Sequence, residues 1–387
     1  MIKADKYNCT GCFACYSACP AKCIEMSYDD DGFLQPRVDS EKCLKCNMCN
    51  KVCPALSKDA QSENTEAFAV VNKDEGIREQ SSSGGMFTAL ASYVLERDGV
   101  VFGAAFDEEF DVKHVEITSP DELHRLRGSK YVQSRIGDIL RKAKEYLDGG
   151  RLVYFSGTPC QISGLLKYLG KDYDNLITQD IVCHGVPSPA VFEEYKKYRE
   201  EKAGSKITYF SFRKKKKGAE GYFVYVEFEN GTVYEAPASK DEYTKMYLRN
   251  ICLRNSCYNC NHKSKNRPSD FTLADFWGVE KLLPEMSADK DKGVSLVLVN
   301  SDKARRILGE ISPQLVVMET NLGSAIGYNK SAISSSAFQW ERKSFVRYVK
   351  KHGFEKAYGK YSKGTLFGKA HRLLRKIIKH TNIRGAK

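Results

Sequence analysis

From position 67 onward, stretches with apolar residues at helical spacing alternate with short continuous apolar runs. Apolar positions at helical spacing predict helices over residues 86–97 and 136–147. The second helix should end at Gly149 and Gly150, because glycine readily adopts the left-handed conformation that closes a helix. Short apolar runs predict buried β-strands at residues 67–71, 100–106, 152–155 and 176–182. This alternation predicts a mixed α/β domain.

A second pattern further along the chain predicts antiparallel structure. Residues 222–229 and 232–235 flank Asn230-Gly231, a pair typical of a tight β-hairpin turn. A strand over residues 207–212 precedes them, and the basic run from Arg213 to Lys217 makes the connection. Most such runs are solvated loops. The alternative is a docking patch for an acidic partner such as ferredoxin, or for an anionic substrate.

The composition is that of a folded chain, since 42% of its 387 residues are hydrophobic and the length allows two or three domains. Charged residues make up 28%, and no apolar stretch approaches the roughly 18 residues that span a bilayer. The segment from Met1 to Cys9 contains Asp5 and lacks the apolar run of a signal peptide. We therefore expect a cytoplasmic protein without transmembrane segments.

The net charge of +12 comes from the C-terminal end of the chain. Residues 341–387 carry fifteen Lys and Arg against two Glu, a net charge of +13, so the remaining 340 residues sum to −1. The body therefore gives no argument for nucleic-acid binding. Residues 370–380 form an amphipathic pattern with apolar residues on one helical face and basic residues around them. Such a helix can make a peripheral contact with an anionic membrane or pack against the body, and the sequence leaves both open.

Cysteine is the strongest chemical signal, with fourteen in the chain and nine of them between Cys9 and Cys53. In a reducing compartment such a density indicates metal ligation rather than disulfide bonds. One run is repeated, which marks an internal duplication with the spacing for two [4Fe–4S] clusters. The chain reads Cys9-x2-Cys12-x2-Cys15-x3-Cys19-Pro20 and then Cys43-x2-Cys46-x2-Cys49-x3-Cys53-Pro54.

The expected ligand sets are crossed, because the fourth cysteine of each run lies past the turn and ligates the other cluster. A pair of structural zinc sites is the alternative, but zinc gives no reason for two proline-terminated runs. Cys23 fits neither set and is expected to be a small buried side chain. The segment resembles bacterial two-cluster ferredoxins over residues 3–57, and a polar stretch at 57–66 has the character of a linker. The two sets are Cys9, Cys12, Cys15 and Cys53, and Cys43, Cys46, Cys49 and Cys19.

Three loops of small residues stand where a predicted strand gives way to a helix, at residues 81–85, 156–161 and 183–188. Glycine lets the backbone approach a ligand closely, hydroxyl groups donate hydrogen bonds, and amides at a helix start attract phosphate. One such loop is commonplace. Three in one domain, beside two clusters, favour an anionic cofactor.

Together with further motifs, these loops resemble the beta subunit of coenzyme F(420) hydrogenase/dehydrogenase over residues 66–340. The resemblance implies FAD, and electron transfer between iron–sulfur clusters and a two-electron partner, of which coenzyme F(420) is the best known. Relatives with the same ferredoxin front end also occur in bacteria, often beside polysaccharide-synthesis enzymes, where the acceptor need not be F(420). The motifs are Ser82-Ser83-Gly84-Gly85, Gly128-Ser129-Lys130-Tyr131-Val132-Gln133-Ser134, Gly157-Thr158-Pro159-Cys160-Gln161, Cys183-His184-Gly185-Val186-Pro187-Ser188, Ser211-Phe212-Arg213, Cys257-x2-Cys260 and Asp275-Phe276-Trp277-Gly278.

The predicted fold class is therefore α+β or α/β, with a ferredoxin domain at residues 1–57, a mixed α/β flavin-binding domain at 66–340 and a basic helical tail at 341–387. A flavin is also expected on chemical grounds. Clusters accept single electrons whereas a hydride carries two, so a cofactor that can exchange one or two electrons is needed between them. Lys130 would offset the charge of the pyrophosphate or of the reduced flavin; alternatively it is a solvated loop lysine. The resemblance implies FAD contacts from Ser83, Gly84, Gly85, Lys130, Tyr131, Gln133, Ser134, Gly157, Thr158 and Pro159.

Cysteines outside the ferredoxin part predict a third cluster. Cys252-x4-Cys257-x2-Cys260 has the spacing of the plant-type [2Fe–2S] run, whereas the family resemblance favours a [4Fe–4S] cluster near the flavin. For the fourth ligand we choose Cys183 over Cys160, because the loop of Cys160 is assigned to the flavin. The alternative is a zinc site or unligated thiols, and His262 could replace a cysteine ligand.

The sequence thus predicts an iron–sulfur flavoprotein oxidoreductase. It would pass electrons between a ferredoxin-like carrier, or a partner oxidoreductase, and an unknown two-electron substrate, with the direction open. His184 is the candidate proton donor, and the alternative for it is a packed structural histidine. Three rivals are a true F(420) oxidoreductase, an electron-transfer module with no substrate site of its own, and a flavin-free sensor whose clusters report oxygen or iron.

Overall fold

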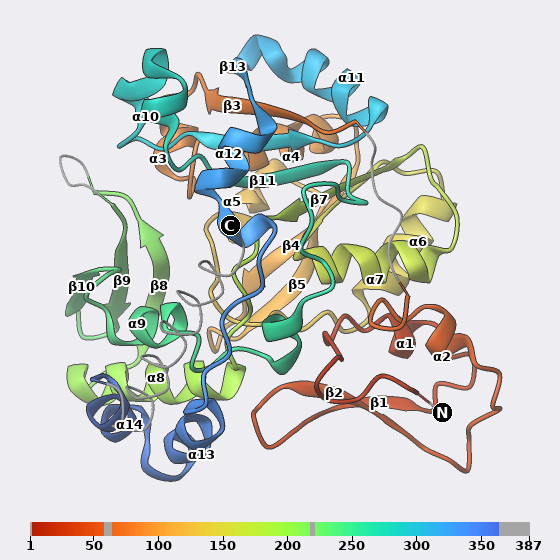
Figure 1. Ribbon diagram of the computed structural model, residues 1–387, viewed down its shortest axis with the longest axis vertical. Coiled ribbons are helices and arrows are strands. Elements are labelled where there is room, and N and C mark those ends of the chain that lie inside the picture. The colour runs from red at the N-terminus through yellow and green to blue at the C-terminus, as the bar shows by residue number, and fades with distance from the viewer. Residues whose placement is uncertain (1, 58–63, 217–220, 364–387) are drawn as a thin grey trace, which may run out of the picture.

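The computed structural model describes residues 2–57, 64–216 and 221–363 (Figure 1). Over these residues the chain forms three sheets, of two, three and eight strands, together with helices. The mixed α/β architecture behind an N-terminal ferredoxin-like unit, expected from the sequence, is confirmed. In the described part, no helix has the length and apolar character needed to cross a membrane.

The N-terminal unit, red to orange in Figure 1, combines one β-hairpin with two one-turn helices. The hairpin pairs β1 (Ile24–Tyr28) with β2 (Leu34–Val38). Its turn is closed by Asp29, whose carboxylate accepts hydrogen bonds from the backbone amides of Asp31 and Phe33, both at 2.9 Å. Helices α1 (Ala14–Ser17) and α2 (Met48–Lys51) each lie in one of the two cysteine runs.

The eight-stranded sheet has the order β13-β3-β12-β11-β7-β6-β4-β5. Pairing directions make β3, β4, β6, β7 and β11 point the same way, so their carboxyl ends share one edge of the sheet, where ligands of open α/β sheets bind. The strands are β3 (Glu66–Asn72), β4 (Val100–Phe106), β5 (Val112–Ile117), β6 (Val153–Gly157), β7 (Leu176–Ile181), β11 (Phe271–Asp275), β12 (Ser295–Val299) and β13 (Leu315–Thr320).

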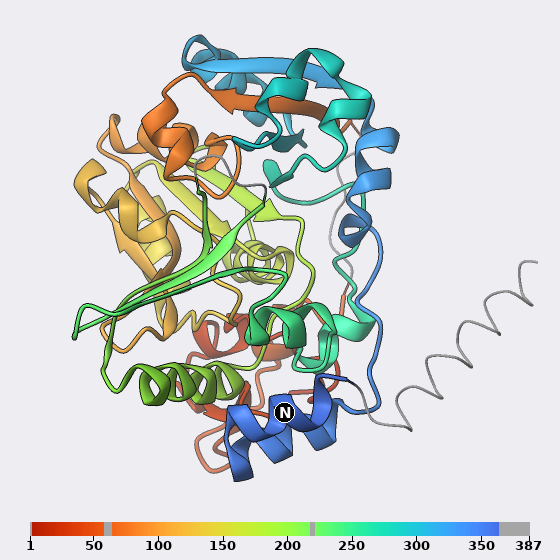
Figure 2. The same ribbon diagram turned by 90° about the vertical axis from the view of Figure 1, so that its left-hand side faces the viewer.

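Helices cover both faces of this sheet (Figures 1 and 2). On one face, α4 (Met86–Leu95) and α11 (Asp302–Ile311) bury Leu90, Val94 and Ile307 against the strands. On the other, α6 (Ile139–Asp148) and α7 (Pro159–Leu169) pack against the strands and against the ferredoxin part. The contact with α7 is close, since a Cβ added at Gly164 would lie 2.8 Å from the Cys12 sulfur. The ferredoxin part is therefore built onto the sheet domain. Smaller helices are α3 (Glu75–Glu79), α5 (Leu123–Leu126), α10 (Val279–Leu282) and α12 (Leu322–Tyr328).

A second layer surrounds the three-stranded sheet of β8 (Ile207–Lys214), β9 (Phe223–Phe228) and β10 (Val233–Pro237). Its core is aromatic, with Phe192, Phe210, Phe212 and Tyr243 in edge and tilted ring contacts. Helices α8 (Pro189–Ala203) and α9 (Glu242–Leu248) supply two of these rings. Figure 2 shows this layer beside the large sheet.

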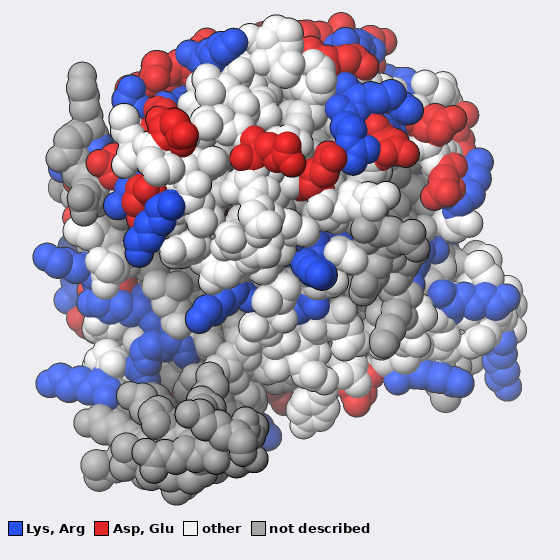
Figure 3. Space-filling view, turned by 45° about the horizontal axis from the view of Figure 1, so that its top comes forward, with Lys and Arg blue, Asp and Glu red and all other residues white. Residues whose placement is uncertain are grey.

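The basic tail begins as folded structure. Helices α13 (Arg342–His352) and α14 (Phe354–Tyr361) bury Phe345, Val349 and Phe354 in the aromatic core, so this part of the tail packs against the body. The amphipathic segment 370–380 lies outside the described residues, as do Lys217 and most of the predicted linker. In Figure 3, acidic and basic side chains intermingle over the upper part of the molecule, whereas Lys and Arg predominate in the lower part.

Candidate functional site

The first cysteine group consists of Cys9, Cys12, Cys15 and Cys53. Burial raises the pKa of Cys12 to about 12, with smaller contributions from the thiolates of Cys9 and Cys53. Burial also raises the pKa of Cys15, and the thiolates of Cys12, Cys9 and Cys53 raise it further. The four thiols thus lie within electrostatic range of one another. That they ligate one cluster, as the first crossed set, stays a prediction.

The backbone repeats itself around the two cysteine runs. Gly11 and Phe13, on either side of Cys12, have φ of 68° and 65°, and Lys45 and Asn47, on either side of Cys46, have φ of 55° and 63°. Phe13 and Asn47 are left-handed and directly precede the right-handed first residues of α1 and α2, and such a left–right pair is the backbone form of an anion-binding nest. Thiolate ligands and such a nest fit an iron–sulfur cluster, whose core sulfides accept hydrogen bonds.

The second cysteine group lines a hollow of about 410 Å³. Its walls include Cys19, Cys43, Cys46 and Cys49, which are the second crossed set. Cys23 is buried, as expected, but it also lines this hollow, and its sulfur lies 3.4 Å from that of Cys19. The site therefore has a fifth thiol, which the run spacing did not identify.

A second hollow, of about 630 Å³, is lined by Cys160, Cys183, Cys257 and Cys260, and we call it the third hollow because it contains the third cysteine group. Burial raises the pKa of Cys160, and the thiolates of the other three cysteines add to the effect. Lys263 and His262 also line the hollow, and the Lys263 ammonium donates a hydrogen bond to the Cys183 carbonyl. Of the predicted third set, the structure brings together Cys183, Cys257 and Cys260.

The structure does not bring Cys252 to this hollow. The side chain is fully buried in the aromatic core, and burial raises its pKa to about 12. Its carbonyl accepts a hydrogen bond from the Ser188 amide, which holds this stretch of backbone beside the start of α8. The fourth cysteine that lines this hollow is Cys160, which the sequence assigned to a flavin loop. Cys160 lies in the first turn of α7, which follows the Thr158 cap.

Arg254 joins the first cysteine group to the third hollow. Its guanidinium donates hydrogen bonds to the Cys9 carbonyl at 2.7 Å and the Leu34 carbonyl at 2.9 Å, and its Nη2 lies 3.5 Å from the Cys9 sulfur. It also donates to the Gln133 side chain at 2.8 Å. The side chain is buried, and no carboxylate in the described part of the chain forms an ion pair with it. Because Arg254 and Thr10 also line the third hollow, the two cysteine sites share a wall.

The loops predicted to bind the flavin meet at the carboxyl edge of the large sheet. The Ser129 amide donates a hydrogen bond to Ser82 Oγ at 2.8 Å, which ties the first loop to the stretch 128–134. Gly84 is needed for packing, since a Cβ there would lie 2.2 Å from the Val70 carbonyl oxygen. The Lys215 ammonium donates to the Ser83 carbonyl at 2.7 Å, so part of the basic run reaches this loop.

His114 ties the same stretch to the loop after β6. Its Nε2 lies 3.0 Å from the Ser156 carbonyl, and its Nδ1 lies 2.7 Å from Ser134 Oγ. A carbonyl only accepts, so Nε2 carries the proton and Nδ1 accepts from Ser134. Burial lowers the pKa of His114 to about 4, which keeps the ring neutral. This histidine was not identified from the sequence, because no motif spacing marks it.

Two of the expected flavin residues are engaged in contacts of their own. Ser134 binds His114, and Gln133 accepts from Arg254 and donates to the Thr10 carbonyl at 2.9 Å. Gln133 therefore lies at the junction with the ferredoxin part. The loop 157–159 begins α7 through a capping box between Thr158 and Gln161, and Pro159 lines the third hollow. The loop that adjoins the flavin candidates thus also reaches the third cysteine group.

Lys130 and Tyr131 occupy the middle of this region. The Lys130 ammonium donates to the carbonyls of Arg125 and Arg127 at 3.0 and 2.9 Å, and burial lowers its pKa to about 7. The Tyr131 ring stacks on Tyr247 with 4.9 Å between centroids.

An ion pair at the end of β11 adds a polar group to the same region. Arg213 pairs with Asp275 at 2.8 Å, and both side chains are largely buried. The second carboxylate oxygen of Asp275 has no hydrogen-bond partner in the described part of the chain. An unpaired buried oxygen beside loops of this kind fits a site that receives a polar ligand.

His184 lies in the loop after β7 and lines the third hollow. Its Nε2 is 2.5 Å from Asn250 Oδ1, and burial lowers its pKa below the ordinary value. The ring contacts Tyr247 edge-on, with 5.2 Å between centroids. His184 is therefore a partly buried, hydrogen-bonded ring beside the third cysteine group.

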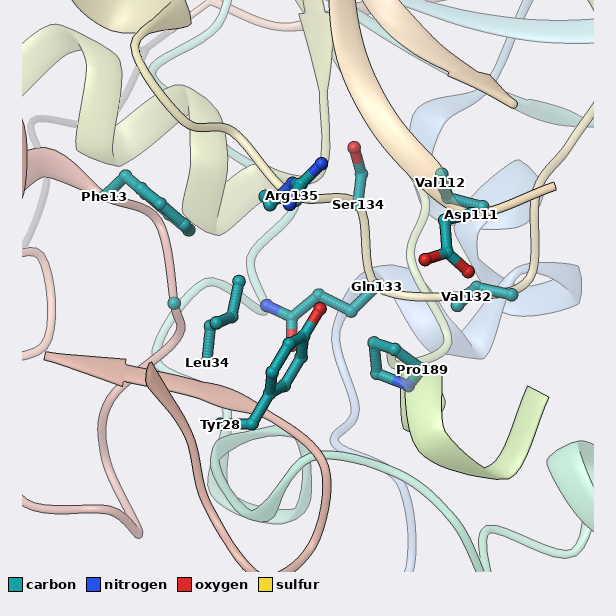
Figure 4. A pocket seen from close by; sticks show the side chains of 11 residues that line it. Phe13, Tyr28, Leu34, Asp111, Val112, Val132, Gln133, Ser134, Arg135 and Pro189 are labelled. Carbon is teal, nitrogen blue, oxygen red and sulfur yellow. The ribbon is translucent and has the colours of Figure 1, made fainter. Parts of the chain in front are cut away.

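Another hollow, of about 480 Å³, lies where the ferredoxin hairpin faces the sheet domain (Figure 4). Tyr28 and Leu34 project into it from the hairpin, opposite Gln133 and Asp111. No cysteine lines it, so we assign no cluster to it.

Comparison with known proteins identifies related chains. Models for the coenzyme F420 hydrogenase/dehydrogenase beta subunit match residues 67–141 (N-terminal part) and 150–323 (C-terminal part), and a 4Fe-4S dicluster domain matches residues 8–56. An F(420)H(2) dehydrogenase subunit of Methanosarcina mazei is 24% identical over 165 residues, which is 40% of this chain and 46% of that protein. The coenzyme F420-dependent sulfite reductase of Methanocaldococcus jannaschii is 32% identical over 168 residues, 42% of this chain and 25% of that protein.

The chain thus spans less than half the length of these curated relatives. Among solved structures, a chain of the F420-reducing [NiFe] hydrogenase complex from Methanosarcina barkeri aligns at 18% identity with a TM-score of 0.42, over 70% of this chain and 91% of that chain. The two beta-subunit models follow one another along the sheet domain, and the dicluster model covers both cysteine runs. The chain therefore belongs to the family of coenzyme F420 hydrogenase/dehydrogenase beta subunits and carries a 4Fe-4S dicluster domain at its N-terminal end.

Proposed function

We propose that the chain is an iron–sulfur flavoprotein oxidoreductase in which three clusters connect a one-electron carrier to FAD and a two-electron partner. The observation that supports this most is the wall at Arg254, shared by the first cysteine group and the third hollow. Cys9 and Cys12 are buried, whereas Cys46 of the second group is exposed. This arrangement supports an order with the second cluster outermost, the first between, and the third innermost.

The proposed ligand sets follow the three cysteine groups. In this proposal Cys160 replaces Cys252 in the third set, because Cys160 shares its hollow with the other three thiols. Residues 1–57 would hold two clusters, residues 66–340 the third cluster and FAD, and 341–387 form the basic tail. The sets are Cys9, Cys12, Cys15 and Cys53; Cys19, Cys43, Cys46 and Cys49; and Cys160, Cys183, Cys257 and Cys260.

For FAD, we assign the loops 82–85, 129–131 and 157–159. FAD supplies the change between one-electron and two-electron transfer. Serine hydroxyls and backbone amides of the first two loops would bind its phosphates, and Lys215 and Arg213 add positive charge nearby. His184 remains the candidate proton donor, because it lines the third hollow beside Cys183 and its Nε2 is hydrogen-bonded to Asn250.

Coenzyme F(420) is the second candidate for the two-electron partner, and the names of two relatives favour it. The assay is anaerobic: the reduced protein is mixed with F(420) and, separately, with NAD or NADP, and hydride transfer is followed from the absorbance of each. Reduction of F(420) alone supports this partner. Reduction of artificial dyes but of no hydride acceptor supports the electron-transfer module instead.

Anaerobic purification followed by iron, sulfide and flavin analysis tests the proposal. About twelve irons and one FAD per chain are expected if all three clusters are [4Fe–4S]. Cys160→Ala should lose about four of these irons, whereas the matched control Cys252→Ala should retain them. Eight irons in the unchanged chain would remove the third site only. Zinc without sulfide would refute the cluster proposal.

A further inference from the structure

The two repeats of the ferredoxin part share a backbone but have opposite surroundings. In the first repeat, Gly11, Phe13 and Ala14 are buried against the sheet domain. In the second repeat, every residue from 44 to 48 is exposed. The two equivalent cluster loops therefore differ in solvent exposure: the sheet domain covers the first, and no described part of the chain covers the second.

The exposed loop is also more apolar than folding requires. Leu44 is 68% exposed, the largest exposed fraction of any large apolar side chain in the described part of the chain, and Met48 is 38% exposed. Both line the hollow of the second cysteine group, together with Cys46. Neither side chain belongs to a buried core. Two apolar side chains at the rim of a redox site, without a packing role, fit the centre of a contact surface.

The charged residues around this loop are mainly lysines. Lys22, Lys45 and Lys51 are exposed, and no ion pair holds them within the described ranges. Lys42 is also exposed and pairs with Asp39 at 3.1 Å. Within residues 39–51 the other acidic residue is Glu41, so three lysines face two carboxylates, and Lys22 adds a fourth lysine.

We propose that Lys22, Leu44, Lys45, Met48 and Lys51, the Leu44 surface, dock an acidic one-electron carrier protein. The inference rests on the proposed function, because electrons must enter or leave the protein at the cluster closest to solvent. A carrier whose own redox centre is ringed by carboxylates matches an apolar centre with a cationic rim, and such charge pairs accelerate transient encounters. Residues 42–51 thus serve as the contact of the molecule with its electron donor or acceptor.

The test uses the full-length, cluster-loaded protein and a bacterial two-[4Fe–4S] ferredoxin of net negative charge. The charge-reversal variant combines Lys45→Glu with Lys51→Glu, and Leu44→Ser tests the apolar centre separately. The matched control, Lys351→Glu with Lys356→Glu, makes the same change in net charge on α13 and α14. Iron content is measured for each variant, and only variants with full iron content are compared.

Charge reversal on the Leu44 surface should lower the rate constant for reduction by ferredoxin about tenfold at low ionic strength, and the control should change it little. The affinity measured by calorimetry should fall in the same order, and cross-linking of lysines to carboxylates should join Lys45 or Lys51 to the ferredoxin. Equal rates in all variants, or equal losses in variant and control, would overturn the proposal. If Lys45→Glu prevents cluster assembly, Leu44→Ser carries the test alone.

Reduced methyl viologen separates this proposal from the proposed function. If the dye reduces the clusters and the flavin but ferredoxin reduces neither, the docking proposal fails and the proposed function stands. If the dye changes neither spectrum, the redox function itself fails and the docking proposal falls with it.

Discussion

Replacing Arg254 by methionine removes a buried positive charge beside the first cluster site and keeps a side chain of comparable length. The guanidinium lies 3.5 Å from the Cys9 sulfur and has no carboxylate partner in the described residues that would balance it. It therefore favours the reduced form of the cluster, which carries one more negative charge. Arg254→Met should lower the reduction potential of that cluster.

The magnitude follows from Coulomb's law. At 3.5 Å and an effective dielectric constant of about 20, the interaction with one electron is about 5 kcal/mol, and at twice that distance it is about half as large. Because the added electron spreads over the cluster, about 2 to 5 kcal/mol brackets the effect, or roughly 100 to 200 mV for a one-electron couple. Arg254→Lys keeps the charge and should shift the potential much less.

The assay is a potentiometric titration followed by electron paramagnetic resonance. The second N-terminal cluster, whose hollow Arg254 does not line, serves as an internal reference. Iron content and flavin content show whether the variant has kept its sites. An unchanged potential in Arg254→Met with all clusters present would refute the electrostatic role and leave Arg254 with only its hydrogen bonds to the ferredoxin part.

Three further changes test the fold around the site. The pKa of His114 is about 4 in the folded protein and about 6.5 in the unfolded chain, so the unfolded chain binds more protons and the free energy of unfolding falls as the pH drops from 6.5 toward 4. Urea unfolding should therefore show a loss of about 1 kcal/mol between pH 7 and 5.5 that is absent in His114→Asn. The same dependence of unfolding free energy on pH in both proteins would contradict the assignment. Gly84→Ala should cost about 1 to 3 kcal/mol because its Cβ meets a strand carbonyl, whereas Gly309→Ala, with open space around it in a helix, should be neutral or stabilising in the same melts. Arg267→Met leaves Asp180 as an uncompensated buried charge and should cost about 3 to 5 kcal/mol, a loss that Asp180→Asn in the same chain should partly recover; no recovery would mean that the pair is not coupled.

Of the eight strands of the central sheet, the sequence predicts β3, β4, β6 and β7, because each contains a short run of buried apolar residues. The strand predicted at 100–106 coincides with β4, and that at 176–182 coincides with β7 within one residue. The helix predicted from 136 begins at 139, because Gly137 adopts a left-handed conformation just before it. β5, β11, β12 and β13 were not predicted, although β12 is itself a short, fully buried run.

The cysteine sites divide in the same way. In each of the first two sites, spacing within one run accounts for three thiols, because two-residue gaps fix a local turn, and the fourth comes from the other run. The third site combines loops nearly one hundred residues apart, from Cys160 to Cys260, so spacing cannot rank its members. Cys252 matches the local pattern, yet its backbone is held by Ser188 and its side chain enters the aromatic core. Burial direction, which sequence spacing does not contain, decides between the two cysteines.

The close contact between Gly11 and Arg254 restricts how the ferredoxin part can be oriented on the sheet domain. Gly11 holds the same position in the first cysteine run that Lys45 holds in the second, and both have a left-handed backbone. A Cβ added at Gly11 would already come within 2.8 Å of the guanidinium, so a lysine there would collide with it and oppose its charge. The absence of a Cβ at Gly11 therefore determines which of the two cysteine runs faces Arg254 and the sheet domain, and so which cluster site lies nearest the third hollow.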